Sequence, residues 1–590
     1  MNLTARSILV LLCLSAVALR AAGTPDVADA AMRGDQVAVE KLVQQHADVN
    51  APQADGATAL HWAVFRSDKA LVDLLIRAGA NPKAANREGS TPLWLASING
   101  DAPIIAKLLD AGADANEHLP LGRTPLMVAS RTGNVDAIKV LLDHGADVNA
   151  KETLRGTTAL MWAADEGHAA AIQLLIQRGA DIKAQSIPVE RGRGPALGKS
   201  NDPRKQVAAL AAAIAAGIST PQLGAVGTTS LIPTVPDRRG GARGGKPAVG
   251  AAGFDQNDDA AVAAFGFGFG KPAPKDGGGL TPLVYAVRSN DLDSVKVLLA
   301  AGADVNQVTG YGWSPLLVAT QNRYYKLGAF LLDHGADVNL ANKGGWTPLY
   351  LATDNRNIES GDYPVRKGDM DHLDFIKLLL DKGANVNARM KDTTETRTVF
   401  TNQWLDENGA TAFLRASQSG DIILMKLLLA HGADPKIDTT LHVTALQVAA
   451  GIGWVEGITY EWSPASTLEA VKMLLDLGLD PNAQADTGRT ALHGAAHKGR
   501  PDVVQVLVDH GARLDIRDYG NTDNRGSAKL VVHTWLPVDY ADGLVRVGVQ
   551  SAIAHPETGL LIRKLMTAAG LPAPPMGRTL ESICVTEACE

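Results

Sequence analysis

Residues 124–149 read Thr-Pro-Leu-Met-Val-Ala-Ser-Arg-Thr-Gly-Asn-Val-Asp-Ala-Ile-Lys-Val-Leu-Leu-Asp-His-Gly-Ala-Asp-Val-Asn and contain the pattern that decides the fold. Thr124 is a favoured helix N-cap, and the proline after it suits the first helical turn, where its missing N–H costs no hydrogen bond. Gly133 interrupts the apolar pattern, and a second amphipathic segment spans 135–142. Gly145 follows the last periodic residue, where a left-handed cap favours a residue without Cβ. The stretch therefore predicts two short helices followed by a turn.

This unit recurs along the chain, and uninterrupted neighbours lie 33 or 34 residues apart. The residue that opens the unit is found at Thr58, Thr91, Thr124, Thr158, Thr281, Ser314, Thr347, Thr411, Thr444 and Thr490. The closing glycine is found at Gly79, Gly112, Gly145, Gly179, Gly302, Gly335, Gly383, Gly432, Gly478 and Gly511. One such unit cannot bury its own apolar face, so we expect neighbouring units to stack on one another.

The repeated letters resemble those of the ankyrin-repeat family. Residues 58–63 (Thr-Ala-Leu-His-Trp-Ala) and 490–495 (Thr-Ala-Leu-His-Gly-Ala) are similar to the family signature Thr-Pro-Leu-His-x-Ala, with Ala in place of Pro. Residues 145–149 and 335–339 (Gly-Ala-Asp-Val-Asn) are similar to its loop motif. The resemblance implies an all-α repeat fold, an α-solenoid of ankyrin-type helix-turn-helix units with β-hairpin loops and about 12 repeats.

The repeats divide the chain into segments. We expect a signal peptide at 1–22, an N-terminal block of repeats with its cap at 24–185, a Gly/Ala/Pro-rich disordered insertion at 186–277, a C-terminal block of repeats at 278–515, a degenerate capping repeat at 516–570, and a Pro-rich, Cys-containing tail at 571–590. Smaller insertions interrupt the C-terminal block near 355–370, 391–408 and 451–466.

Two of these insertions have alternative interpretations. The composition of 186–277 cannot bury enough apolar area to offset backbone ordering, which predicts a disordered loop. The alternative is a segment that folds onto a partner through its Arg and Phe residues. The insertion at 451–466 carries Trp454, Tyr460 and Trp462 in a chain with only 5% aromatic residues. We expect it to pack on the repeats as a structured loop, and a binding loop is the alternative.

The N-terminus indicates export. A basic residue, Arg6, precedes an apolar run of about 13 residues and then small residues, as in a bacterial-type secretory signal. Cleavage after Ala18 and cleavage near Ala22 both fit. An uncleaved anchor is the alternative, but the run is shorter than the roughly 20 residues that span a bilayer. We expect a periplasmic or secreted protein with no membrane span after signal removal.

Two cysteines remain after signal removal, Cys584 and Cys589. An even count in an oxidising compartment favours a disulfide between them, and two free thiols are the alternative. Metal binding is weakly supported because two thiolates without a nearby histidine supply half of a tetrahedral site.

The charge and the motifs favour a protein-binding role over catalysis. The 56 basic and 63 acidic side chains give a net charge of −7, whereas a protein that coats nucleic acid needs a basic surface. No catalytic signature of a hydrolase, phosphate loop or metalloprotease occurs. His61 and His493 at the signature position, and the Asp of each Gly-Ala-Asp loop, are interpreted as structural. We therefore expect no enzyme activity and no cofactor.

Candidate partner-binding residues are those that stacking does not dictate, with Trp, Tyr and Arg favoured because they dominate interface energies. The candidates are Trp62, Phe65, Arg66, Arg131, Trp162, Asp165, Glu166, Tyr285, Arg288, Tyr311, Trp313 and Trp346, with His497 and Lys498 at a further helix end. For each Trp, packing between repeats is an equally good interpretation.

The resulting hypothesis is a monomeric, non-catalytic scaffold that binds another protein on its concave hairpin and first-helix surface. Two alternatives stay open: an accessory subunit of an exported redox enzyme, and a secreted effector directed at a host.

Overall fold

The computed structural model describes residues 26–188, 277–357, 367–391, 408–454, 459–519, 534–545 and 553–579. These residues fall into two compact units. Unit 1 comprises the described parts of 1–189 and 278–342, and unit 2 comprises the described remainder. The signal segment at 1–22, most of the insertion at 186–277 and both Cys584 and Cys589 lie outside the described residues, as do parts of the smaller insertions, the capping repeat and the tail.

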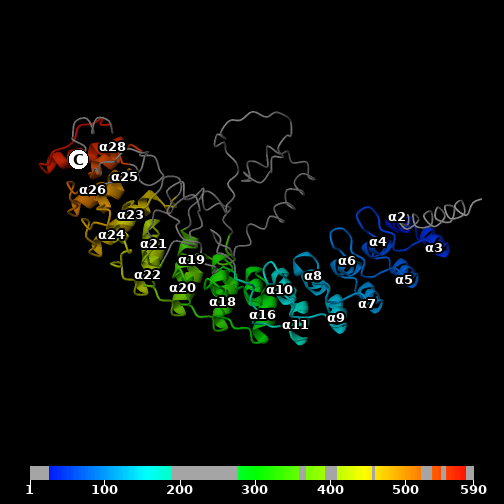
Figure 1. Ribbon diagram of the computed structural model, residues 1–590. Helices are drawn as coiled ribbons and strands as arrows, with labels where there is room; N and C mark the ends of the chain where they lie inside the picture. Colours follow the sequence, from blue (N-terminus) through cyan, green and yellow to red (C-terminus); the bar gives the residue numbers. More distant parts are fainter. Residues whose placement is uncertain are drawn as a thin grey trace, which may run out of the picture. The chain divides into compact units, whose positions relative to one another are not determined.

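Unit 1 is a row of antiparallel helix pairs. Its helices are α2 (Asp26–Arg33), α3 (Gln36–Gln44), α4 (Ala59–Phe65), α5 (Lys69–Arg77), α6 (Pro92–Asn99), α7 (Ala102–Asp110), α8 (Pro125–Thr132), α9 (Val135–Asp143), α10 (Ala159–Glu166), α11 (Ala169–Gln177), α15 (Pro282–Arg288), α16 (Leu292–Ala300), α17 (Pro315–Gln321) and α18 (Tyr325–Asp333). Within unit 1 the first helices of the pairs share one side and the second helices share the other (Figure 1). We call these the first-helix side and the second-helix side.

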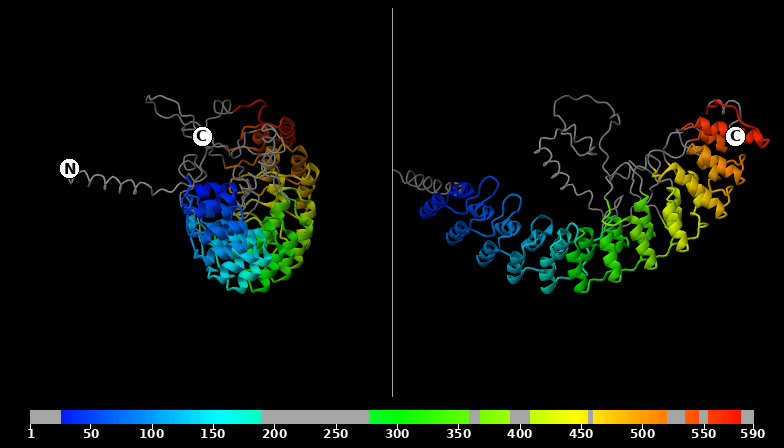
Figure 2. Two further views of the ribbon diagram at one scale, coloured as in Figure 1. Left: turned by 90° about the vertical axis from the view of Figure 1, so that its right-hand side faces the viewer. Right: turned by 180° about the vertical axis from the view of Figure 1, so that it is seen from behind.

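Unit 2 repeats the arrangement. Its helices are α19 (Pro348–Arg356), α20 (His372–Asp381), α21 (Ala412–Gln418), α22 (Ile422–Ala430), α23 (Ala445–Ala450), α24 (Pro464–Asp476), α25 (Ala491–His497), α26 (Pro501–Asp509), α27 (Pro537–Ala541) and α28 (Pro556–Ala568). Each first helix packs on the first helix of the next pair as well as on its own partner, which the right-hand view of Figure 2 shows from behind.

The sequence signals position each helix as expected. In the quoted unit the Thr124 hydroxyl accepts the Met127 N–H and Asn134 accepts the Ala137 N–H, so both helices have side-chain N-caps. Gly145 has φ +85°, and the N–H of the next residue reaches back to the Leu141 carbonyl at 3.0 Å. This is the left-handed ending that a residue without Cβ adopts at least cost.

The loops between pairs are turns, and the described residues contain no β-strand. The single bridge among them joins Leu119 to Arg123. Neighbouring loop tips are instead joined by one backbone hydrogen bond, such as that from Thr153 N–H to the Leu121 carbonyl at 2.8 Å. The expected β-hairpin loops are thus turns too short to form a ladder.

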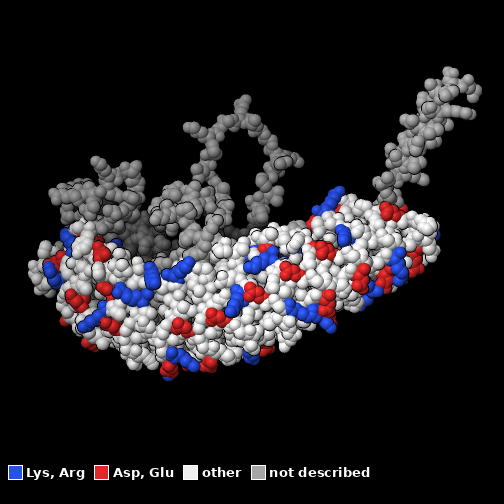
Figure 3. Space-filling view, turned by 60° about the horizontal axis from the view of Figure 1, so that its bottom comes forward, with Lys and Arg blue, Asp and Glu red and all other residues white. Residues whose placement is uncertain are grey.

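Stacking of small aliphatic residues forms the core. The leucine and alanine of the signatures are almost completely buried, as Leu126 and Ala129 are in α8, and Phe413 takes the place of the leucine in α21. The second helices contribute one buried leucine or isoleucine stripe each, such as Ile138 and Leu141 of α9. The second-helix side is covered by interspersed acidic and basic side chains (Figure 3).

Unit 1 remains continuous across the long insertion. The Ser186 N–H donates to the Leu280 carbonyl at 3.0 Å, and the Leu280 N–H donates to the Ser186 hydroxyl at 2.9 Å. Helix α10 packs directly on α15. The chain therefore leaves and returns within one loop between repeats, and stacking of the helix pairs is not interrupted.

Asparagine side chains link successive repeats at the loop after the second helix. Asn149 donates its amide to the Gly179 carbonyl at 3.1 Å and accepts the Asp181 N–H at 2.8 Å. The same pair of bonds is made by Asn50, Asn116, Asn306, Asn387 and Asn482. Lys183 occupies the equivalent position after α11, and an ammonium group cannot accept a hydrogen bond.

We expect Asn149→Ala to lower the free energy of unfolding by about 1–2 kcal/mol, because it removes two hydrogen bonds between repeats. Lys183→Ala is the matched control and should change it by less than about 0.5 kcal/mol. Lys183→Asn should raise stability by restoring the link. Urea unfolding followed by circular dichroism measures all three, and equal effects of the two alanine variants would contradict a stabilising link.

Candidate binding surface

The most accessible candidates lie at the end of α4. Phe65 is 61% exposed, and its ring packs edge-on against Trp62 with centroids 5.8 Å apart. The Trp62 indole is half-buried because its Nε1 donates to Gln53 Oε1 at 2.6 Å in the preceding loop. Arg66 is exposed, and its side chain forms no ion pair with any residue that the structure describes. This helix end therefore offers an aromatic ring beside an unneutralised cation.

The position of Phe65 is occupied by large apolar residues in the repeats on either side. Met32 and Ile98 are the next-to-last residues of α2 and α6, each 33 residues from Phe65, and they are 41% and 46% exposed. We call Met32, Phe65 and Ile98 the apolar row. Sequence reasoning missed Met32 and Ile98, although the 33-residue spacing from Phe65 would have revealed them.

Stacking does not require apolar residues at this position. The next repeats place Arg131, Asp165 and Arg288 there, and their backbones follow the same path. Exposed apolar residues in neighbouring repeats are typical of interaction surfaces in soluble proteins. The apolar row is therefore a feature that the fold tolerates and does not explain.

The charged candidates of the later repeats pair with one another. Arg288 reaches Asp165 at 2.8 Å and Arg131 reaches Glu166 at 3.6 Å, in both cases across neighbouring repeats. The Arg131 guanidinium carbon also lies 5.9 Å from the Trp162 ring centroid. These residues link repeats and are only partly available to a partner.

Four aromatic candidates are buried, so Tyr285 and Tyr311 are not available at the surface and, for Trp313 and Trp346, the structure agrees with packing between repeats. Trp346 is fully buried with its ring edge-on to Tyr350, and Tyr311 and Trp313 are buried beneath their loop, where Thr309 bonds to the Trp313 backbone. Burial raises the pKa of Tyr285. The guanidinium carbon of Arg288 lies 4.8 Å from the centroid of the Tyr285 ring. In each case the ring fills space between repeats. His497 and Lys498, also expected at an exposed helix end, are buried in unit 2.

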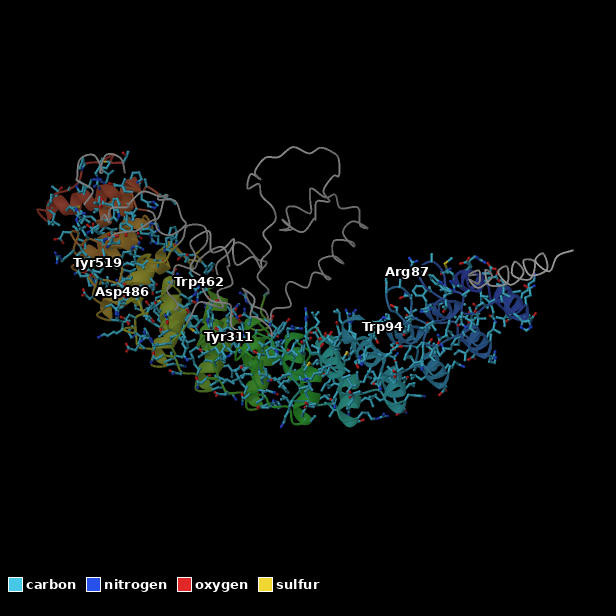
Figure 4. The ribbon with its side chains drawn as sticks, viewed as in Figure 1. Arg87, Trp94, Tyr311, Trp462, Asp486 and Tyr519 are labelled. Atoms are coloured by element: carbon cyan, nitrogen blue, oxygen red, sulfur yellow. The ribbon has the colours of Figure 1, made fainter. Side chains whose placement is uncertain are left out.

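Loop tips of unit 1 add a second set of exposed apolar residues. Leu121, Leu154 and Ile187 are exposed at equivalent places, again 33 residues apart. At the same spacing the two preceding repeats place the polar residues Asp55 and Glu88 at the tip. Figure 4 shows Arg87, the neighbour of Glu88, and Trp94 on the first-helix side of unit 1. Along the repeats of unit 1, the exposed apolar residues of the first-helix side therefore lie first at helix ends and then at loop tips.

Unit 2 differs because its first helices carry buried charges. Arg415 of α21 is fully buried and donates to Asp354 at 3.0 Å, to Gln418 at 3.2 Å and to Ser419 at 3.1 Å. It also donates to the Asn357 carbonyl. A buried guanidinium requires this degree of pairing because desolvation of an unpaired charge costs several kcal/mol.

The insertion between α23 and α24 packs next to Arg415 and its hydrogen-bond partners. Trp462 donates its Nε1 to Asn357 at 2.9 Å and stacks over the Arg356 guanidinium at 4.4 Å. Arg356 in turn bonds Asp421 at 2.7 Å. These contacts agree with a structured loop that packs on the repeats, the first of the two interpretations of its aromatic residues.

The same insertion places an acidic group among cations. Glu461 lies 3.1 Å from Lys498 and 3.0 Å from Arg500. Burial acts to raise the pKa of Glu461, but Lys498, Arg500 and the Thr467 hydroxyl outweigh it, so the pKa is lowered. Burial lowers the pKa of Lys498, which Glu461 partly offsets. The carboxylate is therefore held in its charged form as a tie between the insertion and α25.

His493 has the structural role that the signature predicts. Its Nδ1 accepts the Thr490 N–H at 3.1 Å, and its Nε2 lies 3.2 Å from the Trp535 carbonyl. His61 makes the same pair of contacts, with Thr58 and Ser90. Since Nδ1 must accept, the ring is neutral with its proton on Nε2. Loop aspartates likewise accept backbone N–H groups, as Asp147 does from Asn149 at 2.9 Å.

Among the described residues, no group of three or more His, Cys, Asp or Glu side chains is arranged to hold a metal ion. Within the same ranges no helix has the length and apolar character to cross a membrane. The described residues thus combine structural polar contacts, most developed in unit 2, with exposed apolar residues at the first-helix ends and loop tips of unit 1.

A sequence model of the family described as ankyrin repeats (3 copies) matches residues 27–118, 95–186, 283–390 and 463–523. The matches cover more than half of the chain. The chain belongs to the ankyrin-repeat family. The overlapping matches in unit 1 follow the uninterrupted helix pairs, and the insertions of the ankyrin-repeat chain separate the others.

Curated relatives share short stretches with this ankyrin-repeat chain. The transient receptor potential cation channel subfamily A member 1 homolog of Caenorhabditis elegans is 32% identical over 19% of the chain and 8% of its own length. E3 ubiquitin-protein ligase KEG of Arabidopsis thaliana is 47% identical over 9% of the chain and 3% of its own length. An ankyrin repeat-containing protein of Schizosaccharomyces pombe is 37% identical over 10% of the chain and 28% of its own length. The chain thus spans less than a third of each relative.

Burial of Trp313 leads to a stability prediction in place of a binding one. Trp313→Ala should lower the free energy of unfolding of the ankyrin-repeat chain by about 3–5 kcal/mol, because it removes a large ring that is only 5% exposed. Phe65→Ala is the exposed control and should change it by less than about 0.5 kcal/mol. Urea unfolding compares the two, and an unchanged Trp313→Ala variant would mean that the ring does not hold the repeats.

Two buried histidines make the stability of unit 2 dependent on pH. Burial lowers the pKa of both His493 and His497 to about 4. In an unfolded chain the pKa is about 6.5, so below this pH the unfolded state binds more protons. Their contribution is complete above about pH 6.5 and is lost as the pH falls towards 4, on the order of 2 kcal/mol for each ring at pH 5.

Urea unfolding at pH 7.5 and pH 5 measures this loss. His493→Gln should reduce the loss of stability between pH 7.5 and pH 5 by about half. The chain offers a precedent in Gln447, which occupies the equivalent position: it accepts the Thr444 N–H at 2.8 Å and donates to the Arg489 carbonyl. An unchanged pH dependence in His493→Gln would assign the loss to other groups.

Proposed function

We propose that this ankyrin-repeat chain is a non-catalytic scaffold that binds another protein on the first-helix side of unit 1. The observation that carries the proposal is the apolar row of Met32, Phe65 and Ile98, exposed at a position where later repeats carry charged residues. Burying large apolar side chains against a partner contributes about 1.5–3 kcal/mol each, which is the scale of a binding hot spot.

The assignment to unit 1 follows from what the side chains already do. In unit 2, Arg356 and Lys498 at first-helix ends are paired with Asp421 and Glu461, and Trp462 lies over the Arg356 guanidinium. In unit 1 the corresponding ends at Phe65 and Arg66 contact solvent. A partner can bury the apolar row on α2, α4 and α6 without displacing the ion pairs that the later repeats of unit 1 form.

The proposal includes export to the periplasm or the exterior and a monomeric array of about twelve repeats without a cofactor. Export is supported by the basic and apolar N-terminal segment at 1–22. The repeat number is supported by the recurrence of the opening and closing signatures and by the paired helices.

Affinity capture from the periplasmic and extracellular fractions, with mass spectrometry of the retained proteins, tests the proposal. The full chain should retain a partner that the Phe65→Ser/Ile98→Ser variant loses, because two apolar anchors become polar. Absence of the chain from both fractions would contradict export.

Val37→Ser is the matched control for the capture. Val37 belongs to the same unit and is 77% exposed, but it lies on α3 of the second-helix side. It should retain the partner at the level of the unmodified chain. Equal retention by all three chains would contradict binding at the apolar row, and equal loss would indicate an effect on folding, which circular dichroism would detect.

A further inference from the structure

The apolar row has a spacing that restricts the shape of its ligand. One row residue is presented by each of three successive first helices, α2, α4 and α6, which pack directly on one another. Packed helices lie about 8–10 Å apart. A polyproline II helix repeats every three residues and rises about 9.3 Å in that distance. Such a segment, running along the row, places every third side chain over one row residue.

Aromatic rings flank the row in the same repeats. Trp62 is half-buried and packs against Phe65 at 5.8 Å, and Trp94 of α6 is half-buried with the Arg123 guanidinium 5.7 Å from its ring. Aromatic-lined surfaces recognise proline-rich segments in this conformation. The polyproline II helix is already formed before binding, so the segment loses little conformational entropy when it binds. An α-helical ligand, by contrast, is recognised through its apolar face and does not require aromatic rings beside the row.

The charge beside the row is positive. Arg33 and Arg66 directly follow Met32 and Phe65, both are exposed, and neither forms an ion pair with a described residue. The acidic side chains Asp35 and Asp68, which come next, are engaged as N-caps of the second helices. The two guanidinium groups have no ion-pair partner among the described residues, because the nearby Asp35 and Asp68 carboxylates are directed to the helix N-termini, and they can pair with carboxylates on the ligand.

We propose that the apolar row binds an acidic, proline-rich segment of a partner protein in the polyproline II conformation, with an apolar side chain at every third position. This inference rests on the proposed function and specifies its ligand. The aliphatic residue of each triplet contacts Met32, Phe65 or Ile98, the proline contacts Trp62 or Trp94, and the carboxylate faces Arg33 or Arg66.

Fluorescence anisotropy with a labelled peptide tests this inference on the full chain. The probe is Leu-Pro-Glu repeated three times, which places leucine at every third position. One control peptide has the same composition with the leucines adjacent, and a second is a proline-free helical peptide of equal net charge with leucine at every seventh position. The first probe should bind at least about tenfold more tightly than either control, a difference of about 1.4 kcal/mol.

Substitutions in the chain locate the binding. Phe65→Ser and Ile98→Ser should each weaken binding of the first probe about tenfold, and Arg66→Glu should weaken it and reduce its salt dependence, because only Arg33 then faces the carboxylates. Leu154→Ser, at an exposed loop tip of the same unit, should leave it within about twofold.

Stronger binding of the helical peptide, equal binding of the rearranged peptide, or no binding of any peptide would overturn the inference. The proposed function fails separately: if the captured partner is lost by Phe65→Ser/Ile98→Ser while no peptide binds, the scaffold role stands and the polyproline II ligand does not.

Discussion

The structure depends on one constraint: a pair of helices of nine residues or so cannot enclose its own apolar face. Leu126 and Ala129 of α8 are buried only because α6 and α10 lie against them. The constraint explains why alanine recurs at the contact, where a larger side chain would separate neighbouring first helices. It also explains why the long insertion leaves and returns within one loop, between Ser186 and Leu280, so that α10 and α15 remain in contact.

Polar groups supplement the apolar stacking in two ways. At the loops, asparagines such as Asn149 donate a hydrogen bond to the carbonyl that follows the second helix of the next repeat and accept one from the N–H of its turn. Neighbouring repeats are therefore joined by hydrogen bonds as well as by apolar packing. In unit 2, buried Arg415 replaces the apolar residue of the other repeats, and its guanidinium is satisfied by groups from α19 and α21. Such a cluster is rigid because removal of either partner leaves a buried charge. It therefore supplies a firm base for the insertion that carries Trp462.

Local signals predicted the helices and their ends well, because caps, prolines and glycines act within a few residues. The neutral state of His493, with one hydrogen bond at each ring nitrogen, also follows from its place in the signature. The site was predicted less well. For Trp346 and Trp313 the sequence left surface exposure and packing between repeats open, since a tryptophan in a loop has no periodicity that indicates its face, and the structure buries both. Met32 and Ile98 were missed because their exposure becomes meaningful only when the repeats are aligned side by side.

The sequence by itself determined the repeat period, the family, the helix boundaries and the places where insertions interrupt the array, because each depends on short-range chemistry repeated many times. Only the tertiary structure decided which residues remain exposed and which charges find partners. Arg356 and Asp421, or Arg288 and Asp165, are distant in the chain and meet only through stacking. The distinction between unit 1, with Phe65 and Arg66 open to solvent, and unit 2, with its ends covered, arises in the same way: burial is a property of neighbours in space.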